Sequence, residues 1–150
     1  MNLDNENTVS LETAEKWTQA WRDKHPGACK AFLMPAVDLI EVLNEMGLLS
    51  DKVAEKAQGK ACVKGLKVRA YTAIGSDEPD EDLEEKLLLL ATKKDKKGIY
   101  RDIINGKIDN KNDRRIILKE GVEPIEPISS GIYDFTDPCP PSCDPNSPLN

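Results

Sequence analysis

Residues 87–104 read LLLLATKKDKKGIYRDII, and this stretch decides the fold that the sequence predicts. Residues 87–92 form an apolar run that is typical of a strand at the centre of a sheet. Residues 95–98 favour a hairpin turn with a glycine in the left-handed conformation. Residues 99–104 then return antiparallel. The stretch therefore predicts two paired strands in the middle of an antiparallel sheet.

Further strands flank this pair in the sequence. Residues 66–71 alternate apolar and polar side chains, which is the pattern of a strand with one buried face. Asn105 and Gly106 form a dipeptide that is typical of a two-residue hairpin, so another strand is expected after it. Residues 30–34 and 114–118 add two short strand candidates. Together these segments predict a β-meander.

Helical periodicity is strongest in the first half of the chain. Ser10 is a favourable N-cap for a helix over residues 11–24. A second helix is expected over residues 35–46, and a weaker third one opens at Ser50 and stops near Gly59. In the first two helices the apolar side chains recur every three or four residues, so each is expected to bury one face. The residues on these faces, apolar apart from Thr18, are Leu11, Ala14, Trp17, Thr18 and Trp21, and then Ala36, Leu39, Ile40, Leu43 and Met46.

The predicted fold class is α+β, with N-terminal helices followed by an antiparallel β-meander. The chain divides into a flexible N-terminus over residues 1–9, a single α+β domain over residues 10–121, and an extended Pro/Cys-rich tail over residues 122–150. Seven of the ten prolines lie in this tail. Because proline fixes φ and removes a backbone donor, neither a helix nor a central strand is expected to run through the tail.

The charge and hydropathy of the chain exclude several function classes. The net charge is −6, and an acidic chain is repelled by phosphate backbones, which argues against nucleic-acid binding. The dense basic cluster, with lysines at positions 93, 94, 96 and 97, is interpreted as a solvated turn. No stretch approaches the roughly 20 apolar residues of a membrane span. The acidic N-terminus does not resemble a targeting peptide, so we expect a cytoplasmic protein.

Candidate catalytic residues are few, and the sequence predicts no enzyme and no cofactor. The single histidine, His25, is interpreted as a structural residue at a helix end. The common nucleotide-binding, zinc-protease and hydrolase motifs are absent from the sequence. Asp38, Glu41 and Glu45 fall on one polar face, which is what the solvent side of any amphipathic helix looks like.

The tail cysteines leave three alternatives open. Cys139 and Cys143 are spaced differently from the CxxC pairs of zinc ribbons and thioredoxins. They would complete a zinc site only with further ligands, since zinc needs four; the candidates are Cys29, Cys62, His25 and Asp144. A disulfide between them would close a small loop, although a reducing compartment disfavours it. Two free thiols in a stiff tail are the third alternative.

Several segments resemble a family of short bacterial proteins. The resemblance is carried by residues 31–33, 68–71 and 87–90, and above all by the terminal string Tyr-Asp-Phe-Thr-x-Pro-Cys-Pro-Pro-x-Cys over residues 133–143. It covers residues 10–47 and 65–150, and residues 48–64 resemble an insertion. The resemblance supports the predicted organisation and implies no activity, substrate or partner.

The sequence favours a protein–protein interaction or adaptor module that uses its tail. Pro-rich extended segments bind well because little conformational entropy is left to lose. The expected binding residues are Tyr133, Phe135, Pro138, Pro140, Pro141 and Leu149. The alternative is a thiol or metal-binding protein that uses Cys139 and Cys143. Trp17 and Trp21 are expected in the core, although an exposed pair would instead be an interaction hot spot.

Overall fold

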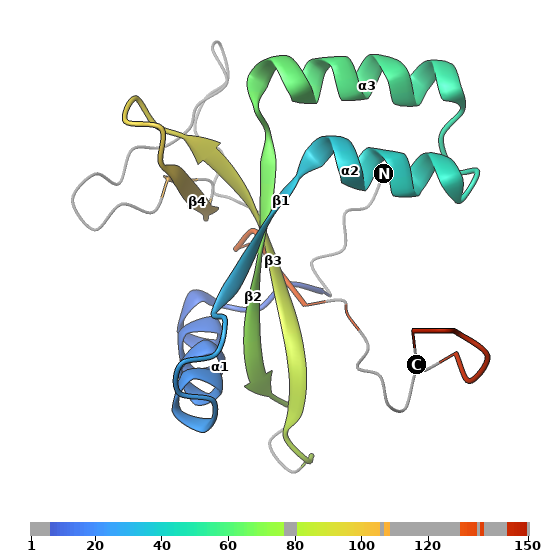
Figure 1. The fold of residues 1–150 in the computed structure, drawn as a ribbon. Helices are drawn as coiled ribbons and strands as arrows, with labels where there is room; N and C mark the ends of the chain where they lie inside the picture. Colours follow the sequence, from blue (N-terminus) through green and yellow to red (C-terminus); the bar gives the residue numbers. More distant parts are fainter. Residues whose placement is uncertain are drawn as a thin grey trace.

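The computed structural model describes residues 7–76, 81–105, 107–108, 130–134, 136 and 144–149. Within these residues an antiparallel sheet forms the centre of the fold (Figure 1). Its path runs through β1 (Ala31–Pro35), β2 (Lys67–Gly75), β3 (Glu84–Lys94), β4 (Tyr100–Ile104) and β5 (Lys107–Ile108), and β6 (Ile132–Tyr133) pairs with β3 beside this path. The predicted antiparallel meander is therefore confirmed.

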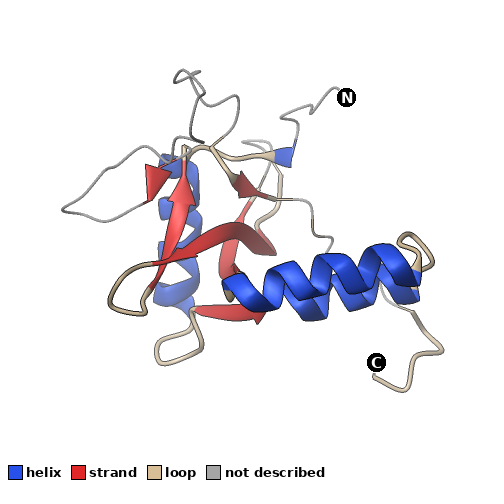
Figure 2. Cartoon of the chain, turned by 90° about the horizontal axis from the view of Figure 1, so that it is seen from above, coloured by secondary structure: helices blue, strands red, loops and turns tan. Residues whose placement is uncertain are grey.

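The described part of the chain contains three helices, namely α1 (Leu11–Lys24), α2 (Ala36–Glu45) and α3 (Asp51–Lys64). Figure 2 shows the sheet with α1 on one side, while α2 and α3 run side by side and extend away on the other. The α+β class, with helices ahead of the meander, is confirmed. Helix α1 thus covers one face of the sheet, whereas α2 and α3 form a helical hairpin that projects from it.

Helix α1 begins where the sequence predicts, because Ser10 caps it. The Ser10 hydroxyl oxygen accepts a hydrogen bond from the backbone N–H of Thr13 at 3.1 Å. Trp17 packs over Gly75 of β2, and Ala14 is buried against the sheet. The core lies between α1 and this face of the sheet; its buried members are Ala14, Ala73, Leu88, Leu90, Ile104 and Ile132.

Strand β3 is the central and longest strand of the described sheet. Successive strand residues point to opposite faces, so Leu88 and Leu90 enter the core under α1 while Leu87 and Leu89 point to the other face. The predicted hairpin after β3 is present, with Gly98 at φ +83°. Asn105, at φ +50°, turns the chain from β4 into β5. The strand expected over residues 114–118 lies outside the described residues.

The two-residue strand β6 places the start of the predicted Pro-rich tail in the sheet, although no helix or central strand runs through the described part of the tail. Ile132 is 1% exposed and pairs with Leu90 of β3. Its carbonyl oxygen accepts a hydrogen bond from the N–H of Val9 at 3.0 Å. Two strand residues fit between the prolines because neither position requires a proline nitrogen to donate. The start of the predicted tail therefore belongs to the folded core.

The helical hairpin of α2 and α3 differs from the sequence-based expectation in two respects. Helix α3 does not stop near Gly59 but continues to Lys64, where Gly65 at φ +56° ends it in the left-handed conformation. Helix α2 covers nearly the predicted span, with Pro35 as its N-cap residue. Its expected buried face is wrong, however, since α2 contains no buried residue.

Candidate interaction surface on the helical hairpin

Helix α2 carries an apolar row that we call the α2 stripe, formed by Leu39, Val42, Leu43 and Met46. The spacing of three and four residues places these side chains on one side of the helix. Val42 is 51% exposed and Met46 is 72% exposed. The described residues therefore leave much of the stripe open to solvent, unlike the apolar side of α1.

The opposite side of α2 is the one that holds α3. The side-chain amide of Gln58 donates to Glu41 Oε2 at 2.6 Å and to the carbonyl of Val37 at 3.4 Å. The Asn44 amide donates to the carbonyl of Leu49 at 2.9 Å, just before α3 begins. With 3.6 residues per turn, the stripe lies on the far side of α2 from these contacts. Pairing with α3 therefore cannot bury it.

The interface between α2 and α3 is narrow. Ala54 and Ala61, the buried residues of α3, are small, and their spacing places them on the same side of α3 as Gln58, which contacts α2. Alanines let two helices approach closely but bury little apolar surface. The hairpin is therefore held together mainly by short side chains and by the amide hydrogen bonds of Gln58 and Asn44.

The sheet fixes the direction of the hairpin through both of its ends. Strand β1 leads into α2 at Pro35, whose extended backbone serves as the N-cap. The N–H of Ala36 donates to the carbonyl of Leu66, just before β2, at 2.9 Å. In Figure 1 the two helices accordingly stand at one end of the sheet, with α2 on the side nearer the sheet and α3 outermost. This anchoring presents the stripe on a rigid support.

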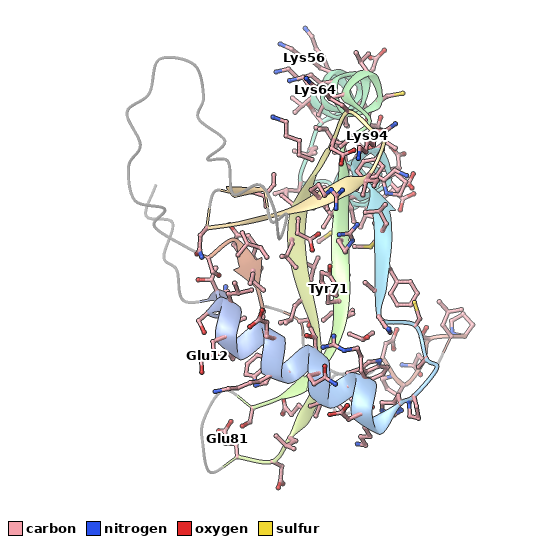
Figure 3. The ribbon with its side chains drawn as sticks, turned by 90° about the vertical axis from the view of Figure 1, so that its left-hand side faces the viewer. Glu12, Lys56, Lys64, Tyr71, Glu81 and Lys94 are labelled. Carbon is pink, nitrogen blue, oxygen red and sulfur yellow. The ribbon has the colours of Figure 1, made fainter. Side chains whose placement is uncertain are left out.

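The basic residues of the two helices all lie on α3, which also carries Asp51 and Glu55. Helix α2 carries Asp38, Glu41 and Glu45 and no basic residue. Helix α3 carries lysines at every fourth position, namely Lys52, Lys56, Lys60 and Lys64. Figure 3 shows Lys56 and Lys64 at the end of the molecule opposite Glu12 and Glu81. The α2 stripe is therefore bordered by carboxylates, and the basic residues of the hairpin lie on α3.

Two of the six predicted binding residues of the tail lie in the described part of the chain. Tyr133 is in β6, paired with Leu89, and its side chain is partly exposed. Leu149 is 96% exposed. Phe135, Pro138, Pro140 and Pro141 lie outside the described residues. The structure therefore places Tyr133 on the sheet and leaves the recognition role of the tail a prediction.

The structure does not test the predicted thiol or metal site, because Cys139 and Cys143 lie outside the described residues. Cys29 and Cys62 are free and exposed. Among the described residues, no group of three or more His, Cys, Asp or Glu side chains is arranged to hold a metal ion. His25 follows the end of α1, with its ring 4.2 Å from that of Trp21. His25 therefore lies at the end of the helix, as the sequence predicts.

The two tryptophans differ in their surroundings. Trp17 packs against the core, as expected. Trp21 is partly buried, and its indole N–H donates to the carbonyl of Cys29 at 3.2 Å. Trp21 thus fastens the end of α1 to the segment that enters β1, and the pair does not form one exposed hot spot.

Comparison of the chain with protein-family models, with curated proteins and with solved structures finds no match. The resemblance to short bacterial proteins stays a prediction. No helix among the described residues is long and apolar enough to cross a membrane.

The sequence predicted an apolar face on α2 that shares Leu39, Leu43 and Met46 with the α2 stripe, but it omitted Val42 and placed the face in the core. The same spacing of apolar residues is produced by a helix that packs on its own sheet and by one that docks a partner. The distinction depends on where the neighbouring elements lie. The sequence contains no separate signal that distinguishes a partner-binding side of α2 from a buried one, because carboxylates such as Asp38 and Glu45 are also typical of a solvent-facing side.

Proposed function

We propose that this protein is a non-enzymatic protein–protein interaction module, and that α2 docks a basic amphipathic helix of another protein. The observation that carries the proposal is the exposure of Val42 and Met46 in a row of four apolar side chains. Laying the apolar face of one helix along such a row is a common mode of recognition.

The chemistry of the partner follows from the border of the stripe. Asp38 and Glu45 are exposed, and each is the neighbour in sequence of a stripe residue, Leu39 and Met46 respectively. Helix α2 carries no basic residue. Lysine or arginine side chains beside the apolar face of a partner would meet these carboxylates, whereas acidic ones would be repelled. Fully burying a valine, leucine or methionine side chain stabilises by about 1.5–3 kcal/mol, so the stripe supplies most of the affinity and the border supplies selectivity.

The proposal is tested with two synthetic amphipathic peptides that share a leucine face and differ only in carrying lysine or glutamate on the polar face. Fluorescence anisotropy measures their binding to the full chain. We expect the lysine peptide to bind and the glutamate peptide to bind at least tenfold more weakly. Because the chain is acidic overall, this contrast alone does not separate docking from general charge attraction.

Substitutions that change no charge distinguish docking on α2 from general charge attraction. The double variant Val42→Ser and Met46→Ser changes no charge and should weaken binding of the lysine peptide at least tenfold. Val63→Ser is the matched control, because Val63 is 89% exposed on α3 and lies outside the stripe; it should change binding less than twofold. Equal binding by all three proteins would refute docking on α2. A dimer in sedimentation that the double variant abolishes would instead make a second copy the occupant.

The tail is retained as a second proposed recognition element, supported by the full exposure of Leu149. Because Ile132 is a core residue, a deletion that tests the tail has to leave residues 130–136 in place. A chain ending at Asp144 should keep the unfolding midpoint of the full chain. If it also keeps every partner of the full chain, the last six residues are not the recognition element.

A further inference from the structure

A cleft of about 360 Å³ lies between α1 and the sheet, on the face of the sheet opposite to the side from which the hairpin extends. Its walls are mostly apolar, and most of its floor comes from core residues of β3, β4 and β6. The lining includes Leu88, Leu90, Ile104 and Ile132. A volume of a few hundred Å³ with apolar walls is typical of sites for small organic ligands.

Helix α1 forms one wall of the cleft with a row of its own. Leu11, Glu15, Thr18 and Arg22 recur every three or four residues and all line the cleft. Trp17 lies outside this row and faces Gly75 of β2. Helix α1 therefore uses one side to cover β2 and the adjacent side to border the cleft, where it places Glu15 and Arg22.

The floor contains a fixed carboxylate. Asp102 of β4 accepts a hydrogen bond from the Tyr71 hydroxyl at 2.6 Å and is paired with Arg69, both from β2. Arg69 also donates to the carbonyl of Tyr100 at 3.0 Å. The Asp102 side chain is only 13% exposed. This network ties β4 to β2 across the central strand, and Figure 3 shows Tyr71 on the face of the sheet beside α1.

The Tyr71 hydroxyl stays protonated over a wide pH range. Burial, followed by the hydrogen bond to the negatively charged Asp102, raises the pKa of Tyr71 to about 12. Tyr71 therefore stays a neutral donor to Asp102. In these two hydrogen bonds each carboxylate oxygen of Asp102 accepts one donor, whereas a carboxylate accepts about four in all. Asp102 therefore retains acceptor capacity, and it is one of the residues that line the cleft.

We propose that this cleft binds a small molecule with an apolar body and one protonated amino group. The body lies on the leucine and isoleucine floor, and the ammonium group is held between Glu15 on the rim and Asp102 on the floor. Among the described lining residues are two carboxylates, Glu15 and Asp102, and one cation, Arg22, whose guanidinium already donates to Gln19 at 2.6 Å; Arg69, which pairs with Asp102, is not one of these lining residues. This site is separate from the α2 stripe, so each proposal can fail without the other.

The probes are 2-phenylethylamine and 3-phenylpropanoate, which have similar apolar bodies and opposite charges. Calorimetric titration of the full chain should show saturable binding of the amine and at least tenfold weaker binding of the acid. Glu15→Gln should weaken the amine at least fivefold. Glu12→Gln is the matched control, because Glu12 is an exposed carboxylate of the same helix that pairs with Lys16 at 2.8 Å and does not line the cleft.

A second variant tests the floor. Asp102→Asn removes the negative charge and should abolish binding of the amine, provided that circular dichroism shows a folded chain. If that variant does not fold, Thr18→Phe, which fills the cleft from α1, should abolish binding instead. Stronger binding of the acid, equal weakening by Glu12→Gln and Glu15→Gln, or no binding of the amine at millimolar concentration would overturn the proposal.

Discussion

Gly75 of β2 lies directly beneath the Trp17 ring, and alanine at this position would place a methyl group where the indole packs. A Cβ atom built on Gly75 would be 2.2 Å from the ring. Ordinary carbon contacts are about 3.5–4.0 Å, so the indole would have to retreat by roughly 1.3 Å or more. Such overpacking costs about 1–3 kcal/mol. Replacing a glycine of a strand with alanine stabilises the fold by about 0.5–1 kcal/mol, because the unfolded chain has less conformational entropy to lose.

The net expectation for Gly75→Ala is a loss of about 1–2 kcal/mol in the free energy of unfolding. For a chain of this length, a loss of that size lowers the midpoint of thermal unfolding by about 2–4 °C per kcal/mol. Urea unfolding followed by far-UV circular dichroism measures the loss, and tryptophan fluorescence reports the displacement of Trp17. The slope of the urea transition should stay unchanged if only packing is affected.

Gly59→Ala is the matched control. Gly59 lies inside α3, and a Cβ atom there would meet nothing within 4 Å. Alanine at this position should therefore stabilise the chain by about 0.5–1 kcal/mol. In a Trp17→Leu background the cost of Gly75→Ala should shrink, because the ring that the methyl group displaces is gone. If Gly75→Ala is as stable as the parent, or costs the same in both backgrounds, the packing of Trp17 on β2 is wrong.

Three further predictions concern the charges and the cap of the folded domain. Lys86 and Asp134 form an ion pair of 2.9 Å, and their side chains are 4% and 6% exposed. Lys86→Met should therefore lower the free energy of unfolding in urea by about 3–5 kcal/mol, because it removes the buried cation that pairs with Asp134, and adding Asp134→Leu should recover most of this loss. An unchanged free energy of unfolding in the single variant would contradict the pairing. Ser10→Ala should cost about 1 kcal/mol through the lost N-cap of α1, and Ser10→Gly only a few tenths. The pKa of Tyr71 is raised to about 12, above the value of about 10 expected for tyrosine in the unfolded chain. Absorbance at 295 nm should therefore show one phenol titrating near pH 12 that Tyr71→Phe removes. The contribution of Tyr71 to stability is complete below pH 10 and is lost as the pH rises toward 12, so a rise in stability over that range would exclude the network.

The features that the sequence predicts well are those that neighbouring residues determine. The cap at Ser10 and the turn that ends in Gly98 both depend on a few adjacent residues. The central position of β3 is predicted for a related reason, because a strand with four consecutive leucines has apolar side chains on both faces. Such a strand has to lie where both faces are at least partly covered.

Features that depend on distant residues were not predicted. Gly59 suggested a helix end, yet α3 continues for five more residues, and Ala61 is packed in a buried position within this last stretch. A glycine inside a helix costs only about 1 kcal/mol, which such packing offsets. Strand β6 was missed because its pairing with β3 joins segments about forty residues apart, while the surrounding prolines pointed to an extended tail. The Asp102 network was missed for the same reason, since Arg69 and Tyr71 come from β2.

Comparison of α1 and α2 shows why the proposed interaction surface could not be recognised from the sequence. Of the three helices, α2 is the most apolar, yet it contains no buried residue, whereas the more polar α1 covers the core. Burial of apolar surface is the main force that drives folding. Within one molecule, the most apolar helix is therefore expected to be the one that covers the core. A short hairpin held by alanines gains little from leaving Val42 and Met46 in water. The distribution becomes favourable once a partner covers the stripe, because the rigid ends at Pro35 and Gly65 have already fixed the surface on which it docks.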